Sequence, residues 1–216
     1  MFPNIEPLKQ PAKGTADMAS SRAPGYGVSE HRGARRLPPR AYYTAILVAL
    51  APMVMLFAAF GSSYIVRQGL SNDWREMSMP PVLWVNTLLL ILSSLALEGA
   101  RRALKNGNTA AFKRYWSTGT VLGLGFVAGQ GVVWWQLASQ GIYVHTNPSS
   151  SFFYLLTVTH VLHLLGGVVA LTWVLSKTPR LRVEAGRCVS VDVSATYWHF
   201  MDGVWLFVFG LFLIGR

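Results

Sequence analysis

Five side chains that could carry chemistry stand within or at the edge of long apolar stretches of this 216-residue sequence: Glu98, His160, His163, His199 and Asp202. Imidazole and carboxylate groups can ligate a metal or a haem iron, and they can also pass protons. A charged group at the centre of a membrane helix costs roughly 2.5–3.5 kcal/mol on insertion scales. We therefore expect these groups, and the milder cases Gln130 and Gln136, to be hidden from lipid by neighbouring helices.

The spacing of these groups places two pairs of them on single helix faces. His160 and His163 are three residues apart, as are His199 and Asp202, and side chains at i and i+3 share a face. One helix face cannot supply both axial ligands of a transmembrane b-haem, although His199 could pair with His160 or His163. Three interpretations follow: ligation, a proton relay, and interhelical hydrogen bonding. We favour the third, because polar side chains often join membrane helices in this way.

Glu98 ends an apolar stretch, and two environments would suit its carboxylate. Arg101 and Arg102 follow it at i+3 and i+4, so an ion pair at the helix end would satisfy it. Counting about 1.5 Å of rise per residue also puts Glu98, His163 and His199 at or inside the membrane midplane. The three groups are therefore predicted to form a polar cluster that fixes three helices to one another.

The composition indicates that a membrane surrounds these groups. Hydrophobic residues make up 52% of the chain and charged residues only 13%, against ~25% charged residues in average soluble domains. A soluble domain of this size could not bury so much apolar surface. The single cysteine, Cys188, cannot form an internal disulfide. These observations exclude a soluble enzyme, a disordered chain and a disulfide scaffold.

The apolar stretches predict an all-α membrane protein, a bundle of five transmembrane helices. The spans are expected at about 41–66, 81–99, 115–138, 151–175 and 195–214, each close to the ~20 residues that a span needs. Residues 1–40, rich in Pro and Gly, are predicted to form a mobile polar and basic tail before the transmembrane domain 41–216. The pairs Trp134-Trp135 and Tyr115-Trp116 are expected to anchor helices at the membrane interfaces.

The basic residues predict an orientation. Of the 19 Lys and Arg residues, 16 fall in the tail and in the two loops that share its side of the membrane. The positive-inside rule therefore places the N-terminus inside and the C-terminus outside. The net charge of +10 then favours anionic phospholipid as a partner rather than nucleic acid, with Arg101 and Arg102 among the head-group contacts.

Four segments resemble one known family. Residues 197–207 read YWHFMDGVWLF, which closely resembles the YWHFVDVVWLF signature of haem-copper oxidase subunit III, and residues 159–167 read THVLHLLGG, similar to its THGxHVxxG pattern. Residues 86–98, with a glutamate at the helix end, and residues 57–67 also resemble that family. The resemblance extends over roughly residues 41–216.

The resemblance implies a five-span bacterial form of a non-catalytic subunit in a respiratory oxidase that reduces oxygen and translocates protons. Such a subunit carries no metal or redox cofactor itself and packs beside the catalytic subunit I, which holds haem and copper. It also binds phospholipid in clefts and supports proton uptake. The expected location is the bacterial inner membrane, where the chain would pass several times. The electron donor, cytochrome c or quinol, would contact other subunits.

Two positions depart from the family pattern, and three alternatives remain. The family often has carboxylates at the positions that correspond to Met53 and Val133, so a proton pathway through them would be missing here. An accessory protein of bacterial nitric oxide reductases shares the same motifs. A b-haem membrane anchor and a secondary transporter are alternatives from other classes, and the lack of an internal repeat in the sequence disfavours the transporter.

Overall fold

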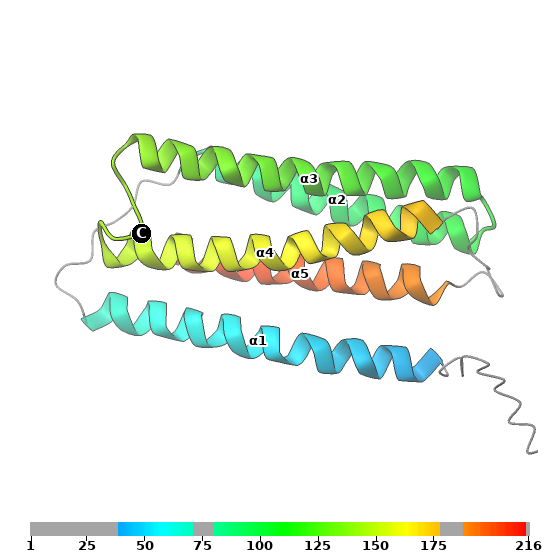
Figure 1. Cartoon of the computed structure of the whole chain (residues 1–216), viewed down its shortest axis with the longest axis horizontal. Helices are drawn as coiled ribbons and strands as arrows, with labels where there is room; N and C mark the ends of the chain where they lie inside the picture. The colour runs from blue at the N-terminus through cyan, green and yellow to red at the C-terminus, as the bar shows by residue number, and fades with distance from the viewer. Residues whose placement is uncertain (1–38, 71–79, 178–187, 215–216) are drawn as a thin grey trace, which may run out of the picture. The chain divides into compact units, whose positions relative to one another are not determined.

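Five long α-helices follow one another in the computed structural model (Figure 1), which describes residues 39–70, 80–177 and 188–214. The helices are α1 (Pro39–Leu70), α2 (Val82–Lys105), α3 (Thr109–Ser139), α4 (Pro148–Lys177) and α5 (Val189–Ile214). Each is long and apolar enough to cross a membrane, and no strand occurs among the described residues. The predicted all-α bundle of five spans is therefore confirmed. The predicted tail, apart from residues 39 and 40, lies outside the described residues.

The helices extend past the apolar stretches that predicted them. α5 begins at Val189, ahead of the expected residue 195, and its first turn contains Asp192. α2 continues to Lys105, and its last turn contains Arg102. Acidic groups near a helix N-terminus and basic groups near a C-terminus interact favourably with the helix dipole. Charged residues ended the apolar stretches from which the spans were predicted. In the structure these residues belong to the terminal turns of the two helices.

Helices α4 and α5 lie between α1 on one side and the pair α2 and α3 on the other. α2 and α3 pack closely along their lengths, and α5 contacts α1, α2 and α4. Figure 1 shows α1 on one side of α4 and α5 and the pair α2 and α3 on the other. α1 packs on α4 and α5 and has no extensive contact with α2 or α3 within the described ranges.

Two glycines of α3 allow the close approach of α2 and α5. A Cβ atom at Gly119 would lie 2.8 Å from Leu97 of α2, and one at Gly123 would lie 2.5 Å from the ring of Trp198 of α5. Small residues at membrane helix interfaces let the backbones approach in this way. These contacts bring α5 against the α2–α3 pair, which is the arrangement that the polar residues of α2 and α5 require.

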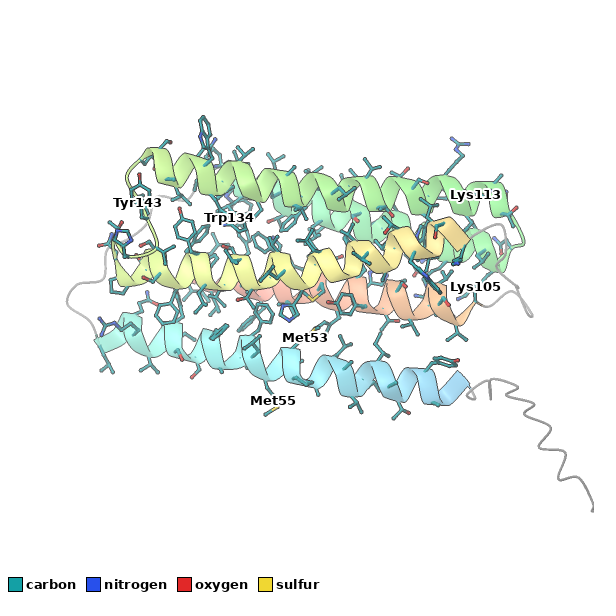
Figure 2. The ribbon with its side chains drawn as sticks, in the orientation of Figure 1. Met53, Met55, Lys105, Lys113, Trp134 and Tyr143 are labelled. Carbon is teal, nitrogen blue, oxygen red and sulfur yellow. The ribbon has the colours of Figure 1, made fainter. Side chains whose placement is uncertain are left out.

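Tryptophans join helices through their ring nitrogens, which corrects part of the prediction of interface anchors. Trp116 is fully buried and donates its indole N–H to the Leu171 carbonyl oxygen at 3.0 Å. Trp134, labelled in Figure 2, is partly buried and donates to the Thr157 hydroxyl at 3.1 Å. Trp135 is 71% exposed, as expected of an anchor. Adjacent residues of a helix are about 100° apart around its axis, so Trp134 can face a neighbouring helix while Trp135 faces outward.

Candidate functional site

A cluster of charged side chains joins the end of α2 to the start of α5. Arg101 donates from Nη1 to Glu98 Oε2 at 3.1 Å, and its Nε and Nη2 both lie 3.1 Å from Asp192 Oδ1. Arg102 donates from Nε to Glu98 Oε1 at 3.3 Å. The side chain of Asp192 is 11% exposed and that of Arg101 is 25% exposed, whereas that of Arg102 is 75% exposed. Arg101 is therefore the residue that links the two helices.

Asp192 is a member of this cluster that the sequence did not reveal. The span expected at 195–214 left Asp192 outside the helix, whereas the structure places it in the first turn of α5. A favourable interaction of an acidic side chain with the N-terminal end of a helix is the signal that could have indicated its place. Its pairing with Arg101 depends on the contact between α2 and α5, which no local pattern in the sequence encodes.

His199 and Ser94 continue the contact between α2 and α5 toward the middle of the bundle. The Ser94 hydroxyl group and His199 Nδ1 are hydrogen-bonded, and both side chains are partly exposed. Glu98 lies close enough to His199 to interact with it electrostatically. The structure thus brings Glu98 and His199, two members of the predicted cluster, to one seam between α2 and α5.

Asp202 lies one turn further along α5 and is buried. Ser94 interacts with its side chain, but neither carboxylate oxygen has a hydrogen-bond partner in the described part of the chain. The residue as a whole is only 7% exposed, and both of its carboxylate oxygens are buried. Asp202 therefore belongs to the seam between α2 and α5 by position, and Ser94 is the residue that connects it to His199.

His163 faces a different helix. Its Nδ1 lies 2.7 Å from the Thr159 carbonyl oxygen of its own helix, and its ring centroid is 6.0 Å from that of Phe57 on α1. Tyr197 donates its hydroxyl group to the His163 backbone oxygen at 2.8 Å, which joins α5 to α4. These contacts place His163 against α1, away from the seam that holds Glu98 and His199.

His160 is fully enclosed by aromatic rings. The centroid of its ring lies 5.2 Å from that of Trp205, 5.8 Å from that of Phe126 and 6.3 Å from that of Phe57. Neither ring nitrogen has a hydrogen-bond partner among the described residues, and the same is true of the buried amide of Gln130. The ring of His160 therefore acts by packing, at the meeting point of α1, α3, α4 and α5.

The two positions where the family often has a carboxylate are filled by apolar side chains. Met53 points from α1 toward the other helices, whereas Met55 points away from them (Figure 2). Val133 of α3 is fully buried. Within the described ranges, no group of three or more His, Cys, Asp or Glu side chains is arranged to hold a metal ion. The polar residues instead form three features. These are the charged cluster around Arg101, the contact of Ser94 with His199 between α2 and α5, and the enclosed imidazole of His160.

Comparison with known proteins identifies the family. The family model described as cytochrome c oxidase subunit III matches residues 44–214, which include most of α1 and all of α2 to α5. The chain belongs to this family. The subunits of this family are non-catalytic parts of haem-copper oxidases, so the chain assembles with other oxidase subunits. Its five long apolar helices make it a multi-pass membrane protein. The predicted family and the predicted role as subunit III of a haem-copper oxidase are therefore confirmed, and the nitric oxide reductase alternative is not favoured.

Relatives from several bacteria match most of the chain. A probable cytochrome c oxidase subunit 3 from Nocardia farcinica is 27% identical over 176 residues, which cover 79% of this chain and 86% of the relative. A protein of the same description from Mycobacterium leprae is 29% identical over 175 residues, with the same coverage. The cytochrome c oxidase subunit 3 of Synechocystis sp. is 26% identical over 211 residues, covering 95% of this chain and 86% of that protein.

Proposed function

We propose that this subunit III packs beside the catalytic subunit I of a respiratory oxidase in a bacterial inner membrane. The observation that carries the proposal is the family match over residues 44–214, which extends through all five described helices. Haem and copper would belong to the partner subunits, and the chain would contribute packing, lipid binding and support of proton uptake. Its N-terminus would lie inside and its C-terminus outside, in accordance with the distribution of basic residues.

We propose that the polar residues of the seam hold α2 and α5 together. Arg101 joins Glu98 to Asp192, and Ser94 joins His199 to the same pair of helices. Of the predicted site residues, Glu98, His163 and His199 are partly exposed, whereas His160 and Asp202 are buried. The ring of His163 lies against Phe57 of α1, so of the three only Glu98 and His199 lie together at the contact between α2 and α5. Support of proton uptake by this chain would therefore fall to Glu98 and His199.

The basic end of the α2–α3 pair is proposed to bind anionic phospholipid. Arg102, Lys105, Lys113 and Arg114 are all exposed there, and Figure 2 shows Lys105 and Lys113 at one end of the bundle, with Tyr143 at the other. Each basic residue near an anionic membrane surface contributes about 1 kcal/mol. Arg101 is paired with two carboxylates, so Arg102 is the better head-group contact of the two predicted arginines.

Purification of the tagged chain from bacterial membranes in mild detergent tests the proposed function. We expect it to recover a large catalytic subunit with haem and copper, and the purified complex to consume oxygen. Recovery of a nitric oxide reductase large subunit, or of haem bound to this chain alone, would contradict the proposal. Native mass spectra of the same complex should show retained anionic lipid that is reduced when Arg102 is replaced by Ala.

A further inference from the structure

The outward face of α5 is flanked by α1 and α2, and this face, hollowed on its α1 side, is called the groove below. α5 contacts both neighbours, while α1 and α2 make no extensive contact with each other among the described residues. An apolar hollow of about 390 Å³ opens between α1 and α5. Its lining comprises Val54, Phe57 and Ala58 of α1, and Phe200, Gly203 and Phe207 of α5. A Cβ atom added at Gly203 would meet no atom within 4 Å.

Polar groups lie on the α2 side of this groove, in the membrane-spanning part of the two helices. Ser94 stands near the middle of the 24-residue helix α2, about 18 Å from either end at about 1.5 Å per residue. The centre of a hydrocarbon core lies roughly 15 Å from its two surfaces. The hydrogen bond between Ser94 and His199 therefore holds a partly exposed imidazole in the membrane-spanning part of the bundle.

This arrangement differs from the outward face of α4. On α4 the exposed side chains at the middle of the span are apolar, with Leu162 63% exposed and Val169 66% exposed. His163, the other histidine that is partly exposed among the described residues, has Phe57 of α1 against its ring. Only Nδ1 of His199 is hydrogen-bonded within the described parts of the chain. Acyl chains offer no hydrogen-bond partner, so a lipid would leave its second nitrogen unsatisfied.

We propose that the groove over α5, between α1 and α2, is the docking site for a transmembrane helix of another subunit of the same oxidase. This helix would fill the apolar hollow beside Gly203 and bring a hydrogen-bonding side chain to His199. Polar residues at the membrane centre are placed against protein rather than lipid, and a glycine on the docking face permits close helix approach. The inference rests on the proposed function, which supplies the partner complex.

Photo-crosslinking in the assembled complex tests the docking site. A benzophenone amino acid replaces Leu206, which is seven residues from His199 on the same face of α5 and is 48% exposed. The matched control carries the same group at Leu162 on the outward face of α4. We expect Leu206 to crosslink to a transmembrane segment of an oxidase subunit, and Leu162 to give lipid adducts only. Adducts of Leu206 with lipid alone or with a second copy of this chain, or a subunit adduct from Leu162 instead, would overturn the proposal.

A pair of glycine variants tests the same surface by assembly. Gly203→Leu fills the groove, whereas Gly131→Leu adds the same bulk to α3 at a position that also has open space around it. We expect Gly203→Leu to lower the recovered partner subunit about ten-fold, the effect of about 1.4 kcal/mol of lost binding free energy. Gly131→Leu should recover the normal amount, and neither variant should change the melting temperature of the purified chain. Equal recovery from both variants would refute the docking site. Failure of the unmodified chain to recover any oxidase subunit would instead refute the proposed function.

Discussion

Arg101 holds together the ends of two helices because two carboxylates share its guanidinium group. Three of its nitrogens lie 3.1 Å from oxygens of Glu98 and Asp192. Hydrogen bonds to charged groups contribute roughly 1.5–3 kcal/mol each when they are shielded, and partial exposure lowers that figure. Arg102 pairs with the same glutamate but is largely exposed, and exposed ion pairs contribute about 0–1 kcal/mol.

Replacing these two arginines should therefore have unequal effects on stability. We expect Arg101→Gln to lower the free energy of unfolding by about 1–2 kcal/mol, because two partly shielded carboxylates lose their cation. Arg102→Gln should lower it by less than about 1 kcal/mol. Thermal unfolding of the detergent-purified chain measures both. Adding Asp192→Asn to Arg101→Gln should restore part of the loss, and equal losses from the two single variants would contradict the role given to Arg101.

His160 provides a second prediction at this scale, because its ring packs against other rings while its nitrogens form no hydrogen bond with any described residue. We expect His160→Phe to be tolerated or stabilising, since it keeps a ring among Phe126, Trp205 and Phe57 and removes two unsatisfied polar atoms. His160→Ala should cost roughly 2–5 kcal/mol through the cavity it leaves. Chemical unfolding in detergent compares the two variants. A large loss in the Phe variant would show that the imidazole nitrogens are needed.

The contact between α3 and α5 depends on one glycine. A Cβ atom at Gly123 would lie 2.5 Å from the ring of Trp198, which is fully buried. We expect Gly123→Ala to lower the free energy of unfolding by about 1–3 kcal/mol, the usual cost of overpacking. Gly131→Ala, with open space around it, should be neutral or stabilising by up to about 1 kcal/mol. Melting temperatures of the two variants test the difference, and similar values would refute the tight contact.

At the scale of whole helices, the sequence predicted which segments are helical but not which face each one turns inward. Apolar stretches located all five spans because the bilayer requires about 20 such residues. Lipid and protein interior are both apolar, so periodicity does not separate the two faces of a membrane helix. For that reason the sequence did not show that Trp116 is buried, or that His163 faces Phe57 of α1.

The candidate site was predicted in a similar, partial way. The free-energy cost of placing an ionisable side chain in lipid identified Glu98 and His199 as candidates. The structure brings both to the contact between α2 and α5. Ser94 and Asp192 escaped notice because a serine is common in membrane helices and an acid among basic residues resembles a loop residue. Both acquire their roles only when α2 lies beside α5, and that contact depends on tertiary packing.

At the scale of the whole molecule, the two connections at opposite ends of α3 differ in charge. The exposed basic residues Arg102, Lys105, Lys113 and Arg114 surround the α2–α3 turn. The α3–α4 connection at residues 140–147 carries no Lys, Arg, Asp or Glu. Basic loops are retained on the cytoplasmic side during insertion, so we expect the α2–α3 turn inside and the α3–α4 connection outside.

Labelling of single cysteines tests this orientation. The only natural cysteine, Cys188, is buried, and Cys188→Ser provides a background without thiols. Asn106 in the α2–α3 turn and Val144 in the α3–α4 connection are both exposed, so either position can present a thiol to water. On intact spheroplasts, a membrane-impermeant maleimide should label Val144→Cys and leave Asn106→Cys unlabelled, because the basic turn stays inside. Both should react once the membrane is opened, which shows that each thiol is accessible. Labelling of Asn106→Cys alone on intact spheroplasts would reverse the orientation and place the phospholipid-binding end on the outer surface.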